Sequence, residues 1–173
     1  QYAFIVYPLV TKAINAVAKE IPAKDWGHDL NGFLTALSDK TKLIFIANPN
    51  NPTGNFLTEA ELDAFLAKVP ENVIVVLDEA YTEFTHPSER VNSFALLEKY
   101  PNLIVSRSLS KAYGLAGLRI GYAVSNPEIT DLLNRVRQPF NCNSLALTSA
   151  IAVMNDDAFV EKVAENNRQE MKR

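Results

Sequence analysis

The chain has 173 residues, of which 47% are hydrophobic and 21% are charged, and its formal net charge is −3. This is enough for one globular domain with a hydrophobic core, and the slightly negative charge disfavours a general nucleic-acid surface. No apolar run approaches the roughly 20 residues that span a bilayer. The single cysteine, Cys142, excludes an internal disulfide and a cysteine metal cluster, and it fits the reducing cytoplasm.

Helical and strand patterns alternate along the sequence. Thr58 begins one helix because Glu61, three residues on, completes a capping-box pattern. In chain order, the patterns predict helices at 9–18 and 30–37, a strand at 42–47, a helix at 58–68, a strand at 72–77, a helix at 92–99, strands at 102–106 and 119–124, and helices at 127–137, 144–154 and 157–172.

This alternation is typical of an α/β fold, with a mostly parallel sheet and helices on both faces. Ligands of such sheets bind at the carboxyl ends of the strands. Polar residues follow three of the predicted strands: Asn51 after the first, Asp78 after the second, and residues 108–111 after the third. The sequence therefore predicts a ligand site at this edge of the sheet.

The stretch SLSKAYGLAGLRIG at residues 108–121 carries most of the chemical information. Lys111 can form a Schiff base with an aldehyde. Ser108, Ser110 and Arg119 can hold a phosphate, because the planar guanidinium of an arginine donates two parallel hydrogen bonds to phosphate oxygens. An aldehyde and a phosphate on one small molecule describe pyridoxal 5′-phosphate (PLP). The alternative is a hydrolase with a Ser-x-x-Lys nucleophile and base, but neither Ser-Asp-Asn nor Lys-Thr-Gly follows downstream.

Asp78 follows the apolar run at 73–77, where a carboxylate is costly unless it is paired. A protonated pyridine nitrogen would be such a partner, and the charged ring would then act as the electron sink that PLP chemistry requires. The alternative is an aspartate that holds Mg²⁺, which the absence of a phosphate loop of the form GxxxxGK[ST] disfavours. Glu79 is a second candidate acid, but strand alternation points it away from Asp78.

Three further residues fit the same cofactor. Tyr81 can donate a hydrogen bond to the 3-oxygen of the PLP ring, and Asn51, in the turn-forming stretch NPNNPTG at 48–54, can point its amide at the same oxygen. Either X-Pro bond of this stretch can be cis. Phe4 can stack on the ring. For each residue alone, side-chain packing or a tight loop is the alternative explanation.

Together these residues resemble fold-type I PLP enzymes, specifically the class I/II aminotransferases. The resemblance rests on residues 108–121 and on the order in which the candidate residues follow one another. Within that group, WGHD at 26–29, DEAY at 78–81 and RQPFNCNSLA at 137–146 are most similar to the histidinol-phosphate aminotransferases.

The resemblance implies a role toward PLP for each candidate residue. Lys111 would bind the cofactor covalently and transfer protons, and Asp78 would pair with the ring nitrogen. Asn51 and Tyr81 would contact the 3-oxygen, and Phe4 would stack on the ring. Ser108 and Arg119, with help from Ser110, would bind the phosphate. No metal site is expected, because His28 and His86 lack ligand partners at suitable spacing.

The resemblance also implies that residues 1–173 are a partial PLP-binding large domain, without an N-terminal segment and most of a small domain. We then expect little turnover from this chain alone and a homodimer at full length. The implied reaction is amino transfer from histidinol phosphate to 2-oxoglutarate in histidine biosynthesis, giving imidazole acetol phosphate and glutamate. The alternatives are an aromatic or aspartate aminotransferase, a threonine-phosphate decarboxylase, or a regulator domain that senses PLP.

Overall fold

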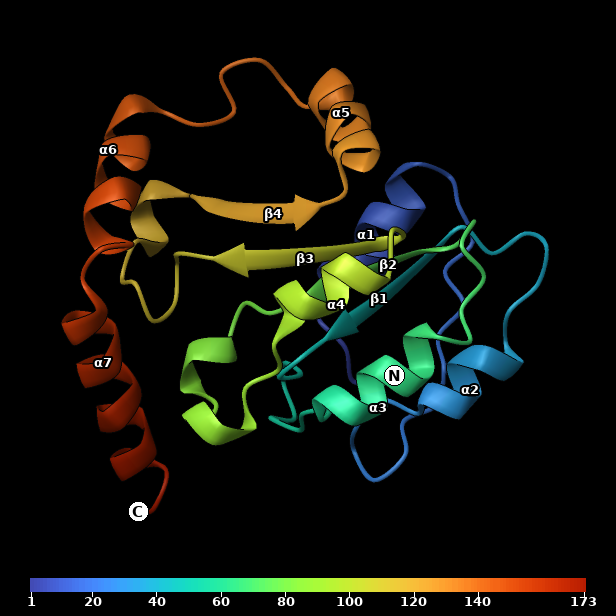
Figure 1. Cartoon of the computed structure of the whole chain (residues 1–173), viewed down its shortest axis with the longest axis horizontal. Coiled ribbons are helices and arrows are strands. Elements are labelled where there is room, and N and C mark those ends of the chain that lie inside the picture. The colour runs from blue at the N-terminus through green and yellow to red at the C-terminus, as the bar shows by residue number, and fades with distance from the viewer.

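Runs of aliphatic and β-branched residues form a four-stranded sheet at the centre of the computed structural model, which describes residues 1–173. The strands lie in the order β1 (Leu43–Ala47), β2 (Ile74–Asp78), β3 (Leu103–Ser108) and β4 (Gly121–Ser125). The first three are parallel, and β4 runs antiparallel to β3, as the arrows in Figure 1 show. The predicted α/β fold with a mostly parallel sheet is confirmed.

Seven α-helices and three 3₁₀ turns connect and cover the strands. They are α1 (Val6–Ala13), α2 (Leu30–Thr35), α3 (Glu59–Leu66), η1 (Thr82–Phe84), η2 (Pro87–Glu89), α4 (Ser93–Lys99), η3 (Ala116–Leu118), α5 (Pro127–Val136), α6 (Ser144–Val153) and α7 (Asp157–Glu170). The capping box that the sequence predicts for α3 is present: Thr58 Oγ1 accepts from Glu61 N–H, and the Glu61 carboxylate accepts from Thr58 N–H at 2.8 Å. None of the helices is both long and apolar enough to cross a membrane.

Several element ends differ from the sequence prediction, and two of these differences have local reasons. Helix α1 ends at Ala13 instead of residue 18, and Asn15 just beyond it has a φ of 58°, in the left-handed region. Strand β3 runs two residues further than predicted, because β4 pairs with it as far as Ser108 and Gly121. Gly121 is required there, since a Cβ would lie 2.6 Å from the Arg107 carbonyl oxygen.

One face of the sheet carries the hydrophobic core. Alternate strand residues point to this face, where helices α3 and α4 cover them. Burying each such aliphatic side chain contributes roughly 1.5–3 kcal/mol. The core comprises Ile44, Ile46, Val75, Leu77, Leu103 and Val105 from the strands, Leu62, Phe65 and Leu66 from α3, and Leu96 from α4, with Val69, Val73 and Val91 from the connections.

The opposite face is covered differently. The ring of Tyr7 on α1 stacks on Phe45 of β1, with ring centroids 4.7 Å apart and planes 6° from parallel. Helix α1 therefore lies against this face, and the prediction of helices on both faces is confirmed. No residue of α1 is fully buried, and Leu9 on its outer surface is 56% exposed.

The carboxyl ends of the three parallel strands meet at one edge. Asp78 pairs with Ala47 on one side and with Ser106 on the other. Helix α7 packs against η1, which follows β2, and Figure 1 shows it beyond the end of the sheet to which β3 points. The candidate residues that follow these strands are thereby brought to a common edge.

Candidate active site

Asp78 is the last residue of β2, and its carboxylate is fixed by two hydrogen bonds. Tyr7 O–H donates to Oδ2 at 2.7 Å, and Ala80 N–H donates to Oδ1 at 3.1 Å. Burial, followed by the charge of Asp78, raises the pKa of Tyr7 well above its usual value of 10.0. Tyr7 therefore stays protonated and remains a donor to the half-buried Asp78 carboxylate.

Tyr7 is a site residue that the sequence analysis missed. It lies three residues after Phe4, on the same side of a helical turn, and this spacing is the sequence feature that could have identified it as a neighbour of Phe4. The Phe4 ring meets Tyr7 edge to face, with centroids 5.7 Å apart. Phe4 is 38% exposed, so part of its ring remains accessible to a ligand.

Asn51, Tyr81 and Lys111 form a second contact group. Asn51 Nδ2 donates to Tyr81 Oη at 3.2 Å, and Lys111 Nζ lies 5.1 Å from the centroid of the Tyr81 ring, within cation–π range. Lys111 is exposed, so its amine is accessible. Both X-Pro bonds of the Asn51 loop, Asn48–Pro49 and Asn51–Pro52, are cis.

Two buried asparagines that precede Asn51 hold its loop in place. The Asn48 side chain accepts from Leu57 N–H at 2.6 Å and donates to the Leu57 carbonyl at 3.1 Å. Asn50 Nδ2 donates to the Tyr2 carbonyl at 2.8 Å. The loop is therefore built from specific hydrogen bonds, and these set the direction of the Asn51 amide.

Ser108, Ser110 and Arg119 form a third group. Ser108 Oγ accepts from Ser110 N–H at 3.2 Å, while Arg119 Nη1 donates to Ser110 Oγ at 3.5 Å and to the Ala116 carbonyl at 2.7 Å. Arg119 has a φ of 57°, a costly conformation for a residue with a side chain. From this backbone position the guanidinium reaches Ser110, whose N–H in turn donates to Ser108.

The three groups offer a charge-matched partner for each polar part of PLP. The carboxylate would suit a cationic ring nitrogen, and the amide and the phenol a ring oxygen. The accessible amine would suit an aldehyde, and the hydroxyls with the guanidinium a phosphate. The residues present therefore fit this cofactor. The structure brings the predicted residues together as these contact groups, and their individual roles remain predictions.

Glu79 has a different environment from its neighbour Asp78. As strand alternation predicts, its side chain lies on the other face, where it is only 1% exposed and pairs with Arg107. Burial raises the pKa of the Glu79 carboxyl, and the Arg107 charge opposes this shift. Glu79 is thus the more deeply buried acid of the two, although it does not belong to the contact groups above.

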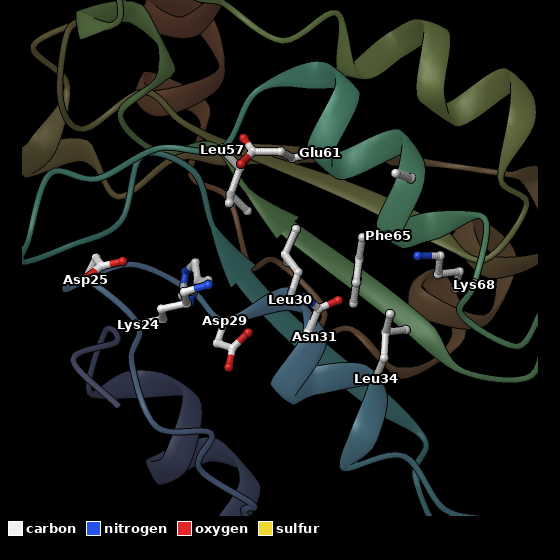
Figure 2. A pocket seen from close by; sticks show the side chains of 12 residues that line it. Lys24, Asp25, Asp29, Leu30, Asn31, Leu34, Leu57, Glu61, Phe65 and Lys68 are labelled. Atoms are coloured by element: carbon white, nitrogen blue, oxygen red, sulfur yellow. The ribbon is translucent and has the colours of Figure 1, made fainter.

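A cavity of about 430 Å³ lies away from these groups, between α2, α3 and the loop at 24–29 (Figure 2). None of the candidate residues lines it. Its apolar floor includes Leu34 and Phe65, and charges of both signs surround it. His28 lines the cavity, and its Nε2 lies 3.1 Å from the Ala47 carbonyl oxygen.

Comparison with known proteins identifies the group to which these features belong. The family model for aminotransferase class I and II matches residues 4–173. Over 173 residues, the chain is 86% identical to histidinol-phosphate aminotransferase 2 of Haemophilus influenzae (strain 86-028NP). The match covers 100% of this chain and 47% of that protein. The chain therefore spans about half the length of the curated relatives it matches.

Solved structures agree with this assignment. The crystal structure of histidinol-phosphate aminotransferase from Sinorhizobium meliloti in complex with PLP has a TM-score of 0.92 and 31% identity, covering 99% of this chain and 47% of that one. L-threonine-O-3-phosphate decarboxylase from Porphyromonas gingivalis has a TM-score of 0.78 and 26% identity, covering 96% of this chain and 49% of that one.

Replacing Tyr7 by phenylalanine keeps the ring on Phe45 but removes the hydrogen bond to Asp78. We expect the free energy of unfolding at pH 7 to fall by about 1.5–3 kcal/mol, because the half-buried carboxylate loses one of its two donors. Urea denaturation followed by circular dichroism measures this difference. Tyr100→Phe is the matched control, since Tyr100 donates to the more exposed Asp63 at 2.9 Å. Equal losses of unfolding free energy in the two variants would contradict a larger contribution from the hydrogen bond to Asp78.

His28 predicts a pH dependence of stability. Burial lowers its pKa in the folded protein below the ordinary value of 6.5. Below about pH 6.5 the unfolded chain therefore takes up a proton that the folded protein does not, and stability falls by up to about 1.4 kcal/mol per pH unit. His28→Gln should flatten the stability profile between about pH 6.5 and 5, whereas His86→Gln, at an exposed position, should leave it unchanged. An unaltered profile for His28→Gln would contradict this explanation.

Proposed function

Because the chain belongs to the class I and II aminotransferase family, we propose that it forms most of the PLP-binding large domain of a histidinol-phosphate aminotransferase. The 86% identity to the Haemophilus influenzae protein over the whole chain carries this proposal. The arrangement of acid, amide, phenol, amine and phosphate-binding groups at one sheet edge supports it independently.

When bound, PLP supplies an electron sink that stabilises negative charge at the carbon next to the substrate nitrogen. We assign the residues to it as the sequence predicts. Lys111 Nζ binds the aldehyde carbon, Asp78 keeps the ring nitrogen protonated, and Tyr81 with Asn51 donates to the ring oxygen. Phe4 covers the ring, and Ser108, Ser110 and Arg119 hold the phosphate.

Lys111 has a second role in this proposal. With the amino substrate in place of its Nζ, the free amine would take the α-proton as general base and then, as general acid, deliver it to the former aldehyde carbon of PLP. The Tyr81 ring, 5.1 Å away, limits where this amine can lie. Tyr7 stays protonated beside Asp78, so it supports the carboxylate without competing for the ring nitrogen.

The proposed reaction converts histidinol phosphate and 2-oxoglutarate into imidazole acetol phosphate and glutamate, a step of histidine biosynthesis. We place it in the cytoplasm, in a longer protein that contains this chain. The remaining segments of that protein would complete substrate recognition and form a small domain. We also propose a homodimer, in which apolar side chains that are exposed on this chain, such as Leu9 and Ile151, become covered.

A second candidate keeps the cofactor and changes the outcome. The structural similarity to the threonine-phosphate decarboxylase of Porphyromonas gingivalis supports it, although the similarity is weaker in both TM-score and identity than for the Sinorhizobium meliloti aminotransferase. A decarboxylase would lose the substrate carboxylate instead of the α-proton. The choice depends on the orientation of the substrate above the same lysine.

Covalent attachment at Lys111 can be tested directly. The full-length protein that contains this chain is mixed with PLP, reduced with borohydride and digested, and the labelled peptide is identified by mass spectrometry. We expect a label on Lys111 and none after Lys111→Ala. Lys99→Ala is the control, because Lys99 pairs with Asp63 on the surface. A label of unchanged amount in the Lys111→Ala protein would contradict the assignment.

The substrate is tested by a product assay on the same full-length protein. With histidinol phosphate and 2-oxoglutarate we expect glutamate to form, and with threonine phosphate we expect no release of carbon dioxide. Carbon dioxide release from threonine phosphate, without glutamate from histidinol phosphate, would favour the decarboxylase. If Lys111 is labelled but neither substrate is turned over, the assignment of the cofactor site stands and both proposed substrates are wrong.

A further inference from the structure

A buried ion-pair cluster lies behind the candidate active site, on the face of the sheet opposite Asp78. Glu79 and Glu83, which are 1% and 6% exposed, flank Tyr81 in sequence and share one guanidinium, that of Arg107 on β3. Arg107 Nε and Nη2 each lie 2.7 Å from Glu79 Oε2, and Nη1 lies 3.6 Å from Glu83 Oε1. Arg107 thus holds both ends of the segment that carries Tyr81.

The cluster also reaches α4. Ser93 Oγ donates to Glu79 Oε2 at 2.9 Å, and the Arg107 guanidinium lies 5.7 Å from the centroid of the Phe94 ring. Arg90 contributes on the far side, where its Nη2 donates to the Glu83 carbonyl at 2.8 Å. Side chains from β3, from α4 and from Arg90, just after η2, therefore converge on the segment at 79–83.

One backbone hydrogen bond ties this segment to β3, and the other backbone bonds of the segment close its own turn, as from Thr82 N–H to the Glu79 carbonyl at 3.2 Å. Glu79 N–H donates to the Ser106 carbonyl at 2.9 Å, just past the end of the β2–β3 ladder. Beyond that bond the two segments separate, because β3 continues to Ser108 paired with β4. A cavity of about 300 Å³, lined by Thr82, Glu83 and Arg107 among others, lies behind η1. Val160 and Glu161 of α7 line the other side of this cavity, so the packing of α7 against η1 leaves open space beside Glu83 and Arg107.

We propose that Arg107 is a positioning residue that fixes Tyr81 in the active site through its ion pairs with Glu79 and Glu83. This inference rests on the proposed function, in which Tyr81 donates to the ring oxygen of PLP. Arg107 immediately precedes Ser108, so the same residue links the segment bearing the phenol to the strand that leads into the phosphate-binding groups.

The electrostatic cost of the cluster supports a positioning role. Two buried carboxylates share one guanidinium, and Glu79 Oε1 and Glu83 Oε2 have no hydrogen-bond partner. Burial raises the pKa of both carboxyls, against the opposing charge of Arg107. Buried ion pairs often stabilise a fold no better than apolar side chains of the same volume would. What the pairs supply here is a fixed geometry on both sides of Tyr81.

A displaced Tyr81 would lose its contacts at both ends. Its Oη accepts from Asn51 Nδ2 at 3.2 Å, and its ring lies beside Lys111 Nζ. A phenol that donates to the ring oxygen lowers the proton affinity of the bound chromophore, whose visible absorption changes with pH. The pH midpoint of this absorption therefore reports the placement of Tyr81 independently of turnover.

The test compares Arg107→Gln, Tyr81→Phe and the double variant in the full-length protein with PLP bound. We expect Tyr81→Phe to raise the midpoint by about one pH unit. Arg107→Gln should raise it in the same direction, and the double variant should not exceed Tyr81→Phe, because both changes act through one phenol. Glu98→Gln, on the exposed surface of α4, is the control and should leave the midpoint unchanged.

Arg107→Lys extends the test if Arg107→Gln does not fold. Lysine keeps the charge but lacks the fork that reaches both acids, so an intermediate midpoint is expected. If the Arg107 variants keep the wild-type midpoint while their urea denaturation midpoint falls, the cluster is structural only and the inference is wrong. If Tyr81→Phe leaves the midpoint unchanged, both the role of Tyr81 and this inference are overturned. If borohydride labels no lysine in the wild-type protein, the proposed function itself fails.

Discussion

Two successive carboxylates lie at the end of strand β2, Asp78 as its last residue and Glu79 directly after it, and the rest of the site depends on the partner that each one finds. Strand alternation sends Asp78 to one face of the sheet and Glu79 to the other. Neither can remain without a partner where it is withdrawn from water. Asp78 accepts from Tyr7 of α1, and Glu79 pairs with Arg107 of β3. Helix α1 on one face and Arg107 on the other are therefore both held by adjacent residues, the last residue of β2 and the one that follows it.

Local sequence signals predict most of the secondary structure, because the forces that form it are local. The apolar runs of β1 and β2 and the capping box at Thr58 need no knowledge of distant residues. Lys111 and Asp78 were predicted because their residue types in sequence order suggest PLP chemistry. Tyr7 and Arg107 were not, since Tyr7 lies 71 positions from its partner Asp78 and Arg107 lies 28 positions from Glu79. Contacts at that separation follow from the register of the sheet, which the sequence pattern leaves open.

The two faces of the sheet have different roles: one contributes mainly to the stability of the fold, and the other carries the Asp78 side chain of the candidate active site. The face beneath α3 and α4 is filled with aliphatic side chains, which gain free energy from burial whatever their exact partners are. The face beneath α1 carries Asp78 and Phe45, and both contact Tyr7 of α1, one through a hydrogen bond and the other through ring stacking. A substitution in the core is therefore read mainly as a change in stability. One on the α1 face also changes the direction in which the Asp78 carboxylate points.

The residues that contact a ligand and those that brace them are interleaved in sequence. Asp78 and Tyr81 alternate with Glu79 and Glu83, while Arg107 directly precedes Ser108. At Asp78–Glu79 and at Arg107–Ser108, extended backbone points adjacent residues to opposite faces, so the ligand-facing residue has a neighbour that anchors the backbone from behind. Tyr81 and Glu83 are separated instead by the turn of η1. A change in either set is transmitted through one or two peptide units, which makes their effects non-additive. The positions of the ligand-facing groups at this edge of the sheet therefore depend on the charged residues Glu79, Glu83 and Arg107 on the opposite face.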